Sequence, residues 1–300
     1  MRKIGMWLYQ NGGGDVIQQK LVKKLYDRGI DTITGLNLRD AVATKEGIFI
    51  NNLKLNDLDL FFSYNAGEQT VYQMYLYEVL NHSIPMINNY NSFALTEDKF
   101  KTGFLLSQNG VASSEFYLCH RDEKEKIKET FNKWGKMVFK PVDGWGGVGM
   151  VLIDSADKFD LILPFLNQTD FRFFYVEKFL DYDGSDYRVD IVDGEIVGCY
   201  GRKANNGDWR TNITSGGSVI KRELNDDLAK VALKAAEVTG LEIAGIDIIY
   251  DRTREEYVVL EVNGIPAFPT PEQVKFGIDF NDKKIDKIVE LIDRKTKDKK

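Results

Sequence analysis

The chain has 300 residues, which is long enough for two or three packed units that share one body. Apolar residues make up 43% of it and charged residues 29%, the balance of an ordinary soluble globular protein. A formal net charge of −6 argues against a protein whose overall field holds it to nucleic acid.

The first 95 residues alternate between strand and helix patterns. Strands are predicted over residues 3–9, 48–50, 58–62 and 84–87, and helices over residues 15–29 and 69–80. Asp15 is expected to cap the first helix. The apolar face of that helix is predicted to carry Val16, Leu21, Val22 and Leu25. Such alternation predicts a mostly parallel sheet covered by helices.

From Thr96 onward the pattern is rich in strands. Thr96 is expected to cap a helix that Gly110 ends, and a second helix is predicted over residues 124–134. Strands are predicted over residues 111–118, 136–140, 150–153, 173–180, 187–192 and 195–200. The dipeptide Asp193-Gly194 between the last two is a strong hairpin signal. The polar segment 203–218 has the composition of a functional loop.

The last third has clear start and stop signals. Asn225 is expected to cap a helix that ends before Gly240. Two strands are predicted over residues 244–250 and 257–263, followed by a helix around residues 282–293.

Cysteine and histidine usage limits the chemistry. Two residues of each type are too few for a disulfide framework, a four-cysteine zinc site or a histidine-rich metal site. Neither His82 nor His120 lies in a catalytic-triad signature. The sequence has no run of the ~20 apolar residues that cross a membrane, so a cytoplasmic protein without a membrane partner is expected.

Residues 144–149, GWGGVG, satisfy the pattern G-x-G-x-x-G. A dinucleotide site requires a helix after the glycines, whereas here a strand is predicted on either side of them. No P-loop lysine follows the glycines. A glycine-rich hairpin can still fold over phosphates, with Lys140 on the entering strand beneath it. The alternative is a flexible hairpin beside a surface lysine.

Asp247 and Glu261 are predicted to face each other on two paired strands. If Tyr250 pairs with Val258, Asp247 lies opposite Glu261, and Asn263 points to the same face. Like charges opposed across a sheet are destabilising, and apolar residues flank both carboxylates. A divalent cation would resolve the repulsion, because two carboxylates and an amide oxygen suit magnesium held against phosphates. The alternative is an exposed acidic face of a hairpin.

Several cations could meet phosphates or substrate, and each has the alternative reading of a solvated surface charge. They are Lys99, Lys140, Arg188, Arg202 and Arg210. The last two border the long loop, where Arg210-Thr211-Asn212 offers donors that carboxylates and phosphates accept.

The order of short motifs resembles the ATP-grasp superfamily, and within it the RimK-like amino-acid ligases related to glutathione synthetase. The matching segments are TEDKF (96–100), VFKPVDGWGGVGMV (138–151), VEKFL (176–180), DYR (186–188), GRK (201–203), WRTN (209–212), GG (216–217), LAKVALKAAEVTGL (228–241), AGIDII (244–249) and LEVNGIP (260–266). The resemblance implies an α/β fold that becomes α+β in its C-terminal part. It implies a Rossmann-like domain over residues 1–95, a central ATP-grasp subdomain with the glycine flap over residues 96–175, and a C-terminal subdomain with a magnesium site over residues 176–300.

The resemblance also implies a role for each matching position. ATP and its phosphates are assigned to Lys99, Lys140, the flap glycines Gly144, Gly146, Gly147 and Gly149, and Arg188. Adenine and ribose are assigned to the hinge Glu177, Lys178, Phe179 and Leu180, and to Asp186. Catalytic roles at the γ-phosphate and the acyl phosphate fall to Arg202, Arg210 and Asn212. Mg²⁺, with Mn²⁺ as a substitute, is assigned to Asp247, Glu261 and Asn263.

Two positions depart from the family pattern. Glu177-Lys178 stands where relatives often have glutamine and then glutamate, and Ser215 stands where they frequently carry arginine. Because the second position faces the acceptor side, specificity for glutamate does not simply carry over.

The implied activity is that of an ATP-dependent carboxylate–amine ligase. ATP would phosphorylate the carboxylate of a small molecule, a peptide or a protein terminus, and an α-amino acid, with glutamate as one candidate, would attack the acyl phosphate. Relatives are often dimers or tetramers, so a homo-oligomer is expected. The alternatives are a peptide-modifying ligase of the macrocyclase type, a small-molecule kinase of the same fold, and a nucleotide-binding regulator without turnover. Tyr72, Tyr75 and Tyr77 would either dock a peptide or pack in the core.

Overall fold

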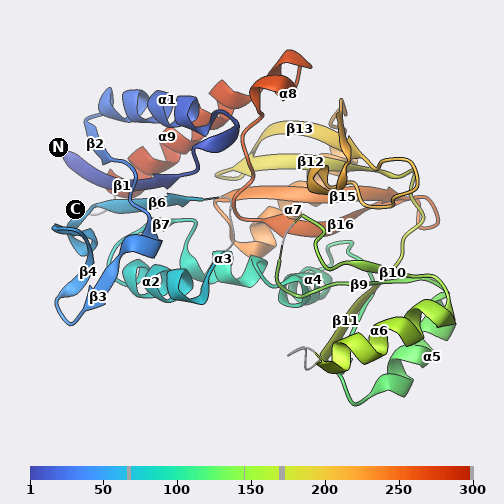
Figure 1. The fold of residues 1–300 in the computed structure, drawn as a ribbon. Coiled ribbons are helices and arrows are strands. Elements are labelled where there is room, and N and C mark those ends of the chain that lie inside the picture. Colours follow the sequence, from blue (N-terminus) through green and yellow to red (C-terminus); the bar gives the residue numbers. More distant parts are fainter. Residues whose placement is uncertain (66–68, 145, 169–172, 298–300) are drawn as a thin grey trace.

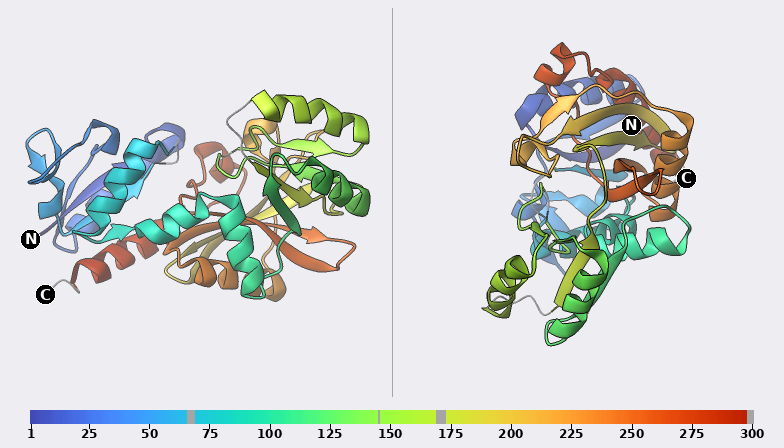
Figure 2. Two further views of the ribbon diagram at one scale, coloured as in Figure 1. Left: turned by 90° about the horizontal axis from the view of Figure 1, so that it is seen from below. Right: turned by 90° about the vertical axis from the view of Figure 1, so that its right-hand side faces the viewer.

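The computed structural model describes residues 1–65, 69–144, 146–168 and 173–297. Three larger sheets organise the chain (Figure 1). The first and second sheets lie at opposite ends of the molecule (Figure 2). This mixture of parallel and antiparallel sheets with covering helices confirms the α/β fold expected of an ATP-grasp protein.

The first sheet is parallel, as predicted. Its strands run in the order β2 (Ile30–Ile33), β1 (Arg2–Leu8), β6 (Leu60–Tyr64) and β7 (Met86–Ile87). Helices α1 (Gly14–Tyr26) and α9 (Asn281–Lys297) cover one face, and α2 (Val71–Asn81) covers the other (Figure 1). A small antiparallel sheet, β3 (Val42–Thr44), β4 (Gly47–Ile50) and β5 (Leu53–Lys54), packs beside α2.

The start of α1 differs from the expectation. Gly13, in the left-handed region with φ of 91°, precedes the helix, and no side chain caps it, so Asp15 is not the cap. Ile17, Leu21 and Leu25 are buried, whereas Val16 is exposed. Residues four apart share one helix face, and the apolar residue that continues this series is Ile17 rather than Val16.

The second sheet is antiparallel, in the order β10 (Val151–Ile153), β9 (Met137–Phe139), β11 (Phe173–Lys178) and β8 (Phe116–His120). Helices α5 (Lys124–Trp134) and α6 (Ala156–Gln168) cover one face (Figure 1). The preceding helices are α3 (Tyr90–Thr96) and α4 (Lys99–Gln108). Thr96 therefore ends α3, and the cap of α4 is Asp98, whose side chain accepts the N–H of Lys101.

The third sheet is antiparallel and carries most of the predicted site. Its order is β14 (Ser218–Ile220), β13 (Glu195–Lys203), β12 (Ser185–Val192), β15 (Ile243–Asp251) and β16 (Glu256–Asn263). Helix α7 (Asp226–Thr239) packs on one face; Asn225 caps it and Gly240 ends it, as predicted. The hairpin at Asp193-Gly194 is also confirmed, with φ of 51° and 76° at the two residues. The short helix α8 (Pro271–Lys275) follows β16.

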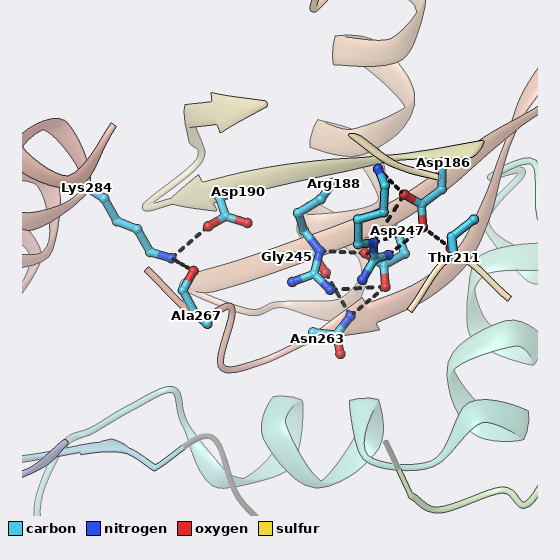
Figure 3. Close-up of polar contacts among 10 residues, drawn as sticks. Asp186, Arg188, Asp190, Thr211, Gly245, Asp247, Asn263, Ala267 and Lys284 are labelled. Carbon is cyan, nitrogen blue, oxygen red and sulfur yellow. Dashed lines mark hydrogen bonds and ion pairs between the residues drawn. The ribbon is translucent and has the colours of Figure 1, made fainter. Parts of the chain in front are cut away.

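The first and third sheets are joined by buried polar contacts. The side-chain amide of Asn88 donates to the carbonyls of Ile243 and Gly264. Lys284 of α9 is completely buried, and its Nζ lies 2.7 Å from Asp190 Oδ2 (Figure 3). The same Nζ lies 2.7 Å from the Pro266 carbonyl. Helix α9 falls in the predicted C-terminal subdomain, yet it shares a core with the first sheet. The division of the chain at residues 95 and 175 therefore stays a prediction.

No helix in the described part of the chain is long and apolar enough to cross a membrane.

We predict that Lys284→Met destabilises the protein by about 3–5 kcal/mol, because Asp190 would remain charged and buried without its partner. Burial lowers the pKa of Lys284 even though the Asp190 charge raises it, so the pair exists against a desolvation cost. Urea unfolding measures the loss. The double variant Lys284→Met/Asp190→Asn should recover most of it, and equal losses in the single and double variants would contradict this account.

Candidate active site

A cleft lies between the second and third sheets and has two halves. One half is a cavity of about 550 Å³ under the glycine hairpin, and the other is an adjacent cavity of about 530 Å³ beside the end of β11. Lys140, Met150 and Asn212 line both, so the halves form one continuous site. We call them the polar half and the apolar half.

The apolar half suits a planar ring. Its walls include Val138, Met150, Phe179, Leu180, Trp209, Ile249 and Leu260. The backbone N–H of Lys178 donates to the Glu115 carbonyl and that of Phe179 to the Lys136 carbonyl. Glu177 is paired within the sheet. Among the described residues of the predicted hinge, the N–H of Leu180 is therefore the one left to donate to a ligand. The side chains of Lys178 and Glu115 are partly exposed and form an ion pair, with Lys178 Nζ 2.6 Å from Glu115 Oε1.

The polar half holds two lysines whose ammonium groups are already paired. Lys140 Nζ lies 2.6 Å from Glu177 Oε2, and the Tyr175 hydroxyl donates to the other oxygen of Glu177. Lys99 Nζ lies 3.0 Å from Glu261 Oε1 and donates to the Gly144 carbonyl. Burial lowers the pKa of Lys99, but the Glu261 charge outweighs burial and raises it above its ordinary value. Lys99 is therefore charged, and both lysines line the cavity.

A row of alternating charges crosses the third sheet on the face toward the cleft (Figure 3). The row consists of Asp186, Arg202, Asp247 and Arg188, and Thr211 lies at one end of it. The Thr211 hydroxyl donates to Asp186, Arg202 bridges Asp186 and Asp247 at 2.6 and 2.9 Å, and Arg188 clamps Asp247 through Nε and Nη2. Successive strand residues point to opposite faces, so Val189 and Ile191 enter the core under α7 instead.

The register of the two acidic strands agrees with the prediction at the site. Asp247 pairs with Glu261 and Gly245 pairs with Asn263. Beyond them a bulge at Leu260 shifts the pairing, so Tyr250 lies opposite Tyr257 rather than Val258. The bulge also turns Leu260 toward the cleft, where it lines both halves.

Protein cations lie against both carboxylates and offset their repulsion, and the assignment of magnesium to Asp247, Glu261 and Asn263 stays a prediction. Lys99 neutralises Glu261, while Arg188 and Arg202 neutralise Asp247. Burial raises the pKa of Asp247, but the two guanidinium groups outweigh burial and hold it below its ordinary value. No group of three acidic, histidine or cysteine side chains within the described ranges forms a metal cage. The fit to a hard cation rests on two carboxylates and the Asn263 amide on one face, with Asn263 Nδ2 3.4 Å from Asp247 Oδ2.

The glycine hairpin closes over the polar half. Gly144, Gly146, Gly147 and Gly149 all have φ between 68° and 103°, a region that side chains disfavour. The hydroxyls of Thr214 and Ser215 donate to the Gly146 carbonyl at 2.8 and 3.3 Å. A Cβ at Gly146 would approach the Thr214 hydroxyl to 2.7 Å, so glycine permits this contact. Trp145, inside the motif, lies outside the described residues.

Four residues that were assigned to phosphates, substrate or metal do not line the polar half. Arg210 lines the apolar half and pairs with Asp208, lowering the pKa of that carboxyl to about 2. Arg188 and Asn263 lie behind Asp247, and Gly149 packs near Pro141, so none of the three lines either cavity. The remaining predicted side chains, with the hinge, line the cleft.

Two contacts of the site were not expected from the sequence, that of Thr211 with Asp186 and that of Tyr175 with Glu177. Strand alternation could have placed Tyr175 on the same face as Glu177. Thr211 lies in a loop, where no periodicity predicts its direction.

Comparisons with known proteins agree with this architecture. The family model of the RimK-like ATP-grasp domain matches residues 96–288. The tetrahydromethanopterin:alpha-L-glutamate ligase of Methanocaldococcus jannaschii is 29% identical over 79% of this chain and 81% of its own length. The alpha-aminoadipate–LysW ligase LysX of Saccharolobus solfataricus is 28% identical over 76% of this chain and 82% of its own.

Solved structures share the fold at low sequence identity. D-cycloserine synthetase DcsG superposes with a TM-score of 0.73 at 10% identity, over 98% of this chain and 99% of that one. The ATP-grasp ligase PsnB, complexed with a minimal precursor, gives 0.69 at 16% identity, over 95% and 97%. The chain belongs to the RimK-like ATP-grasp family and is a ligase that forms a carbon–nitrogen bond between an acid and an amine.

Proposed function

We propose that this ligase uses ATP to convert a carboxylate into an acyl phosphate and then joins it to the amino group of an α-amino acid. The observation that carries the proposal is the cleft itself, in which an apolar slot adjoins lysine and arginine side chains under a glycine hairpin. Adenine fits the slot beside the Leu180 N–H, and the phosphates fit the polar half, near Lys99, Lys140 and Arg202.

Catalysis by positioning suits these residues. The cysteines and histidines, Cys119, Cys199, His82 and His120, line neither half of the cleft, so no described thiol or imidazole there could form a covalent intermediate. Lysine and arginine side chains around the polar half would hold the reacting phosphoryl group in line and neutralise its developing charge. Mg²⁺, or Mn²⁺ in its place, held by Asp247, Glu261 and Asn263, would neutralise phosphate charge.

The amine substrate is proposed to be an acidic α-amino acid. The names of both relatives described above contain one, glutamate in the first and α-aminoadipate in the second. Ser215 donates to the Gly146 carbonyl of the glycine hairpin, and Arg210 is paired with Asp208. To bind the side-chain carboxylate of an acidic amino acid, Arg210 would have to exchange Asp208 for it. Glutamate is therefore the first candidate to test.

A peptide or protein acceptor is the second candidate, and an exposed row on α2 favours it. Tyr77 is buried and serves packing, whereas Tyr72 is exposed and its hydroxyl donates to the Ala41 carbonyl. Val71, Tyr75 and Val79 are exposed at intervals of four residues and form one apolar stripe. Such a stripe could dock a peptide that carries the reacting carboxylate.

We predict that ADP release with Mg²⁺ and ATP requires both an amino acid and a carboxylate partner. Glu261→Gln should lower turnover by at least about 100-fold, because the side chain loses the charge that would hold the cation. Thermal melting should stay near that of the wild type, because glutamine keeps the volume of a side chain that is 25% exposed. A coupled assay across an amino-acid panel measures this. Full activity in the variant would contradict the assignment of Glu261.

Hydroxylamine separates the ligase from the kinase and regulator alternatives. We predict that hydroxylamine, replacing the amino acid, yields a hydroxamate of the carboxylate substrate together with ADP, because a free nucleophile can intercept an acyl phosphate. A stable phosphorylated product without hydroxamate would indicate a kinase. Nucleotide binding without ADP formation under any combination would indicate a regulator.

We call the hydrogen bonds from the Thr214 and Ser215 hydroxyls to the Gly146 carbonyl the latch. We expect the latch to limit opening of the glycine hairpin, the predicted flap. Each hydrogen bond contributes about 1 kcal/mol, so Thr214→Val/Ser215→Ala should speed limited proteolysis within residues 143–150 severalfold. Ser218→Ala, outside the latch, is the control. Equal cleavage rates in the latch variant and the wild type would show that these bonds do not hold the flap.

A further inference from the structure

Among the described residues, each lysine or arginine that lines the polar half already has a carboxylate partner, and so does Arg188 behind Asp247. Lys99 pairs with Glu261, Lys140 with Glu177, Arg202 with Asp186, and Arg188 with Asp247. These four pairs carry no net charge. A free divalent cation therefore meets carboxylates that are already neutralised, and a free nucleotide meets cations that are already occupied.

Asp247 is the one of these four carboxylates that two guanidinium groups contact. Its Oδ1 accepts from Arg188 Nε at 2.5 Å and lies 2.9 Å from Arg202 Nη2. Its Oδ2 accepts from Arg188 Nη2 at 3.1 Å and from Asn263 Nδ2 at 3.4 Å. Each carboxylate oxygen accepts about two hydrogen bonds, so no position on Asp247 is left for a cation.

The two arginines on Asp247 differ in what else they can reach. Arg202 lines the polar half and can exchange Asp247 for a phosphate oxygen. Arg188 does not line the cleft: it lies behind Asp247, and its side chain is only 11% exposed. Phosphate can therefore draw Arg202 away from the front of Asp247, while Arg188 remains behind it.

We propose that Arg188 is a positioning residue that makes metal binding conditional on nucleotide. Its guanidinium holds Asp247 in place and cancels its charge, so the carboxylate attracts a divalent cation only when nucleotide phosphates occupy Arg202 and add negative charge of their own. Metal and nucleotide then bind as one cooperative unit, with reciprocal effects on each other's affinity. The inference rests on the proposed function, since it takes Asp247 as a metal ligand.

The test measures metal binding without turnover. Mn²⁺ is titrated by EPR and Mg²⁺ by calorimetry, each alone and with ADP. For the wild type we expect weak metal binding alone and much tighter binding with ADP. For Arg188→Gln we expect metal alone to bind at least about fivefold tighter, with the metal–ADP coupling reduced by a similar factor. A purely structural role for Arg188 would weaken both.

Matched variants isolate the effect. Arg222→Gln removes an arginine that pairs with Asp183 and stacks on Tyr187, outside both halves of the cleft, and should leave both affinities unchanged. Arg188→Gln/Asp247→Asn should lose the gain, because no carboxylate is exposed by removing the guanidinium. If Arg188→Gln does not fold, Arg188→Lys decides, since an ammonium group cannot clamp both oxygens and metal alone should bind a few-fold tighter.

Two results would overturn the inference in different ways. If Arg188→Gln or Arg188→Lys folds and binds ADP, yet binds metal alone no tighter than the wild type, Arg188 does not control the metal. If the wild type binds no ADP with or without metal, the proposed function itself fails, and the inference fails with it.

Discussion

The buried charges between the second and third sheets constrain the rest of this structure. Isolated charges are costly to hold away from water, and four carboxylates here, Glu261, Glu177, Asp247 and Asp186, each have a lysine or arginine within ion-pair distance. Strand alternation makes this arrangement feasible, because the same strands that place Asp186 and Asp247 toward the cleft place Val189 and Ile246 in the core under α7. The face that binds and the face that stabilises are two sides of one sheet.

The first sheet supports this site from a distance. Asn88 and Lys284 hold the backbone that follows Asn263, through the carbonyls of Gly264 and Pro266. Tyr64, at the end of β6, donates to the same Pro266 carbonyl. The end of the proposed metal-binding strand is therefore fixed by side chains from β6, from α9 and from the loop after β7, and α9 serves as the link.

Local and periodic signals explain why much of the fold was predictable. The cap at Asn225, the turn at Asp193-Gly194 and the pairing of Asp247 with Glu261 all depend on neighbouring residues or on a two-residue period. Thr96 is not the cap of α4, because Asp98 occupies that position. Asp15 is not the cap of α1, because no side chain caps that helix. Helix α6 was not expected at all. The bulge at Leu260 and the ion pairs around Asp247 are tertiary features, and a sequence pattern cannot show which cation reaches which carboxylate.

The central claim is that nucleotide phosphates and a divalent cation exchange partners with these ion pairs in the cleft. A crystal structure of the protein with Mg²⁺ and ADP tests it most directly. The account predicts phosphate oxygens within hydrogen-bond distance of Lys99, Lys140 or Arg202, a metal ion on Asp247 and Glu261, and Arg188 still behind Asp247. Nucleotide bound elsewhere, with Lys99–Glu261 and Lys140–Glu177 unchanged, would contradict it.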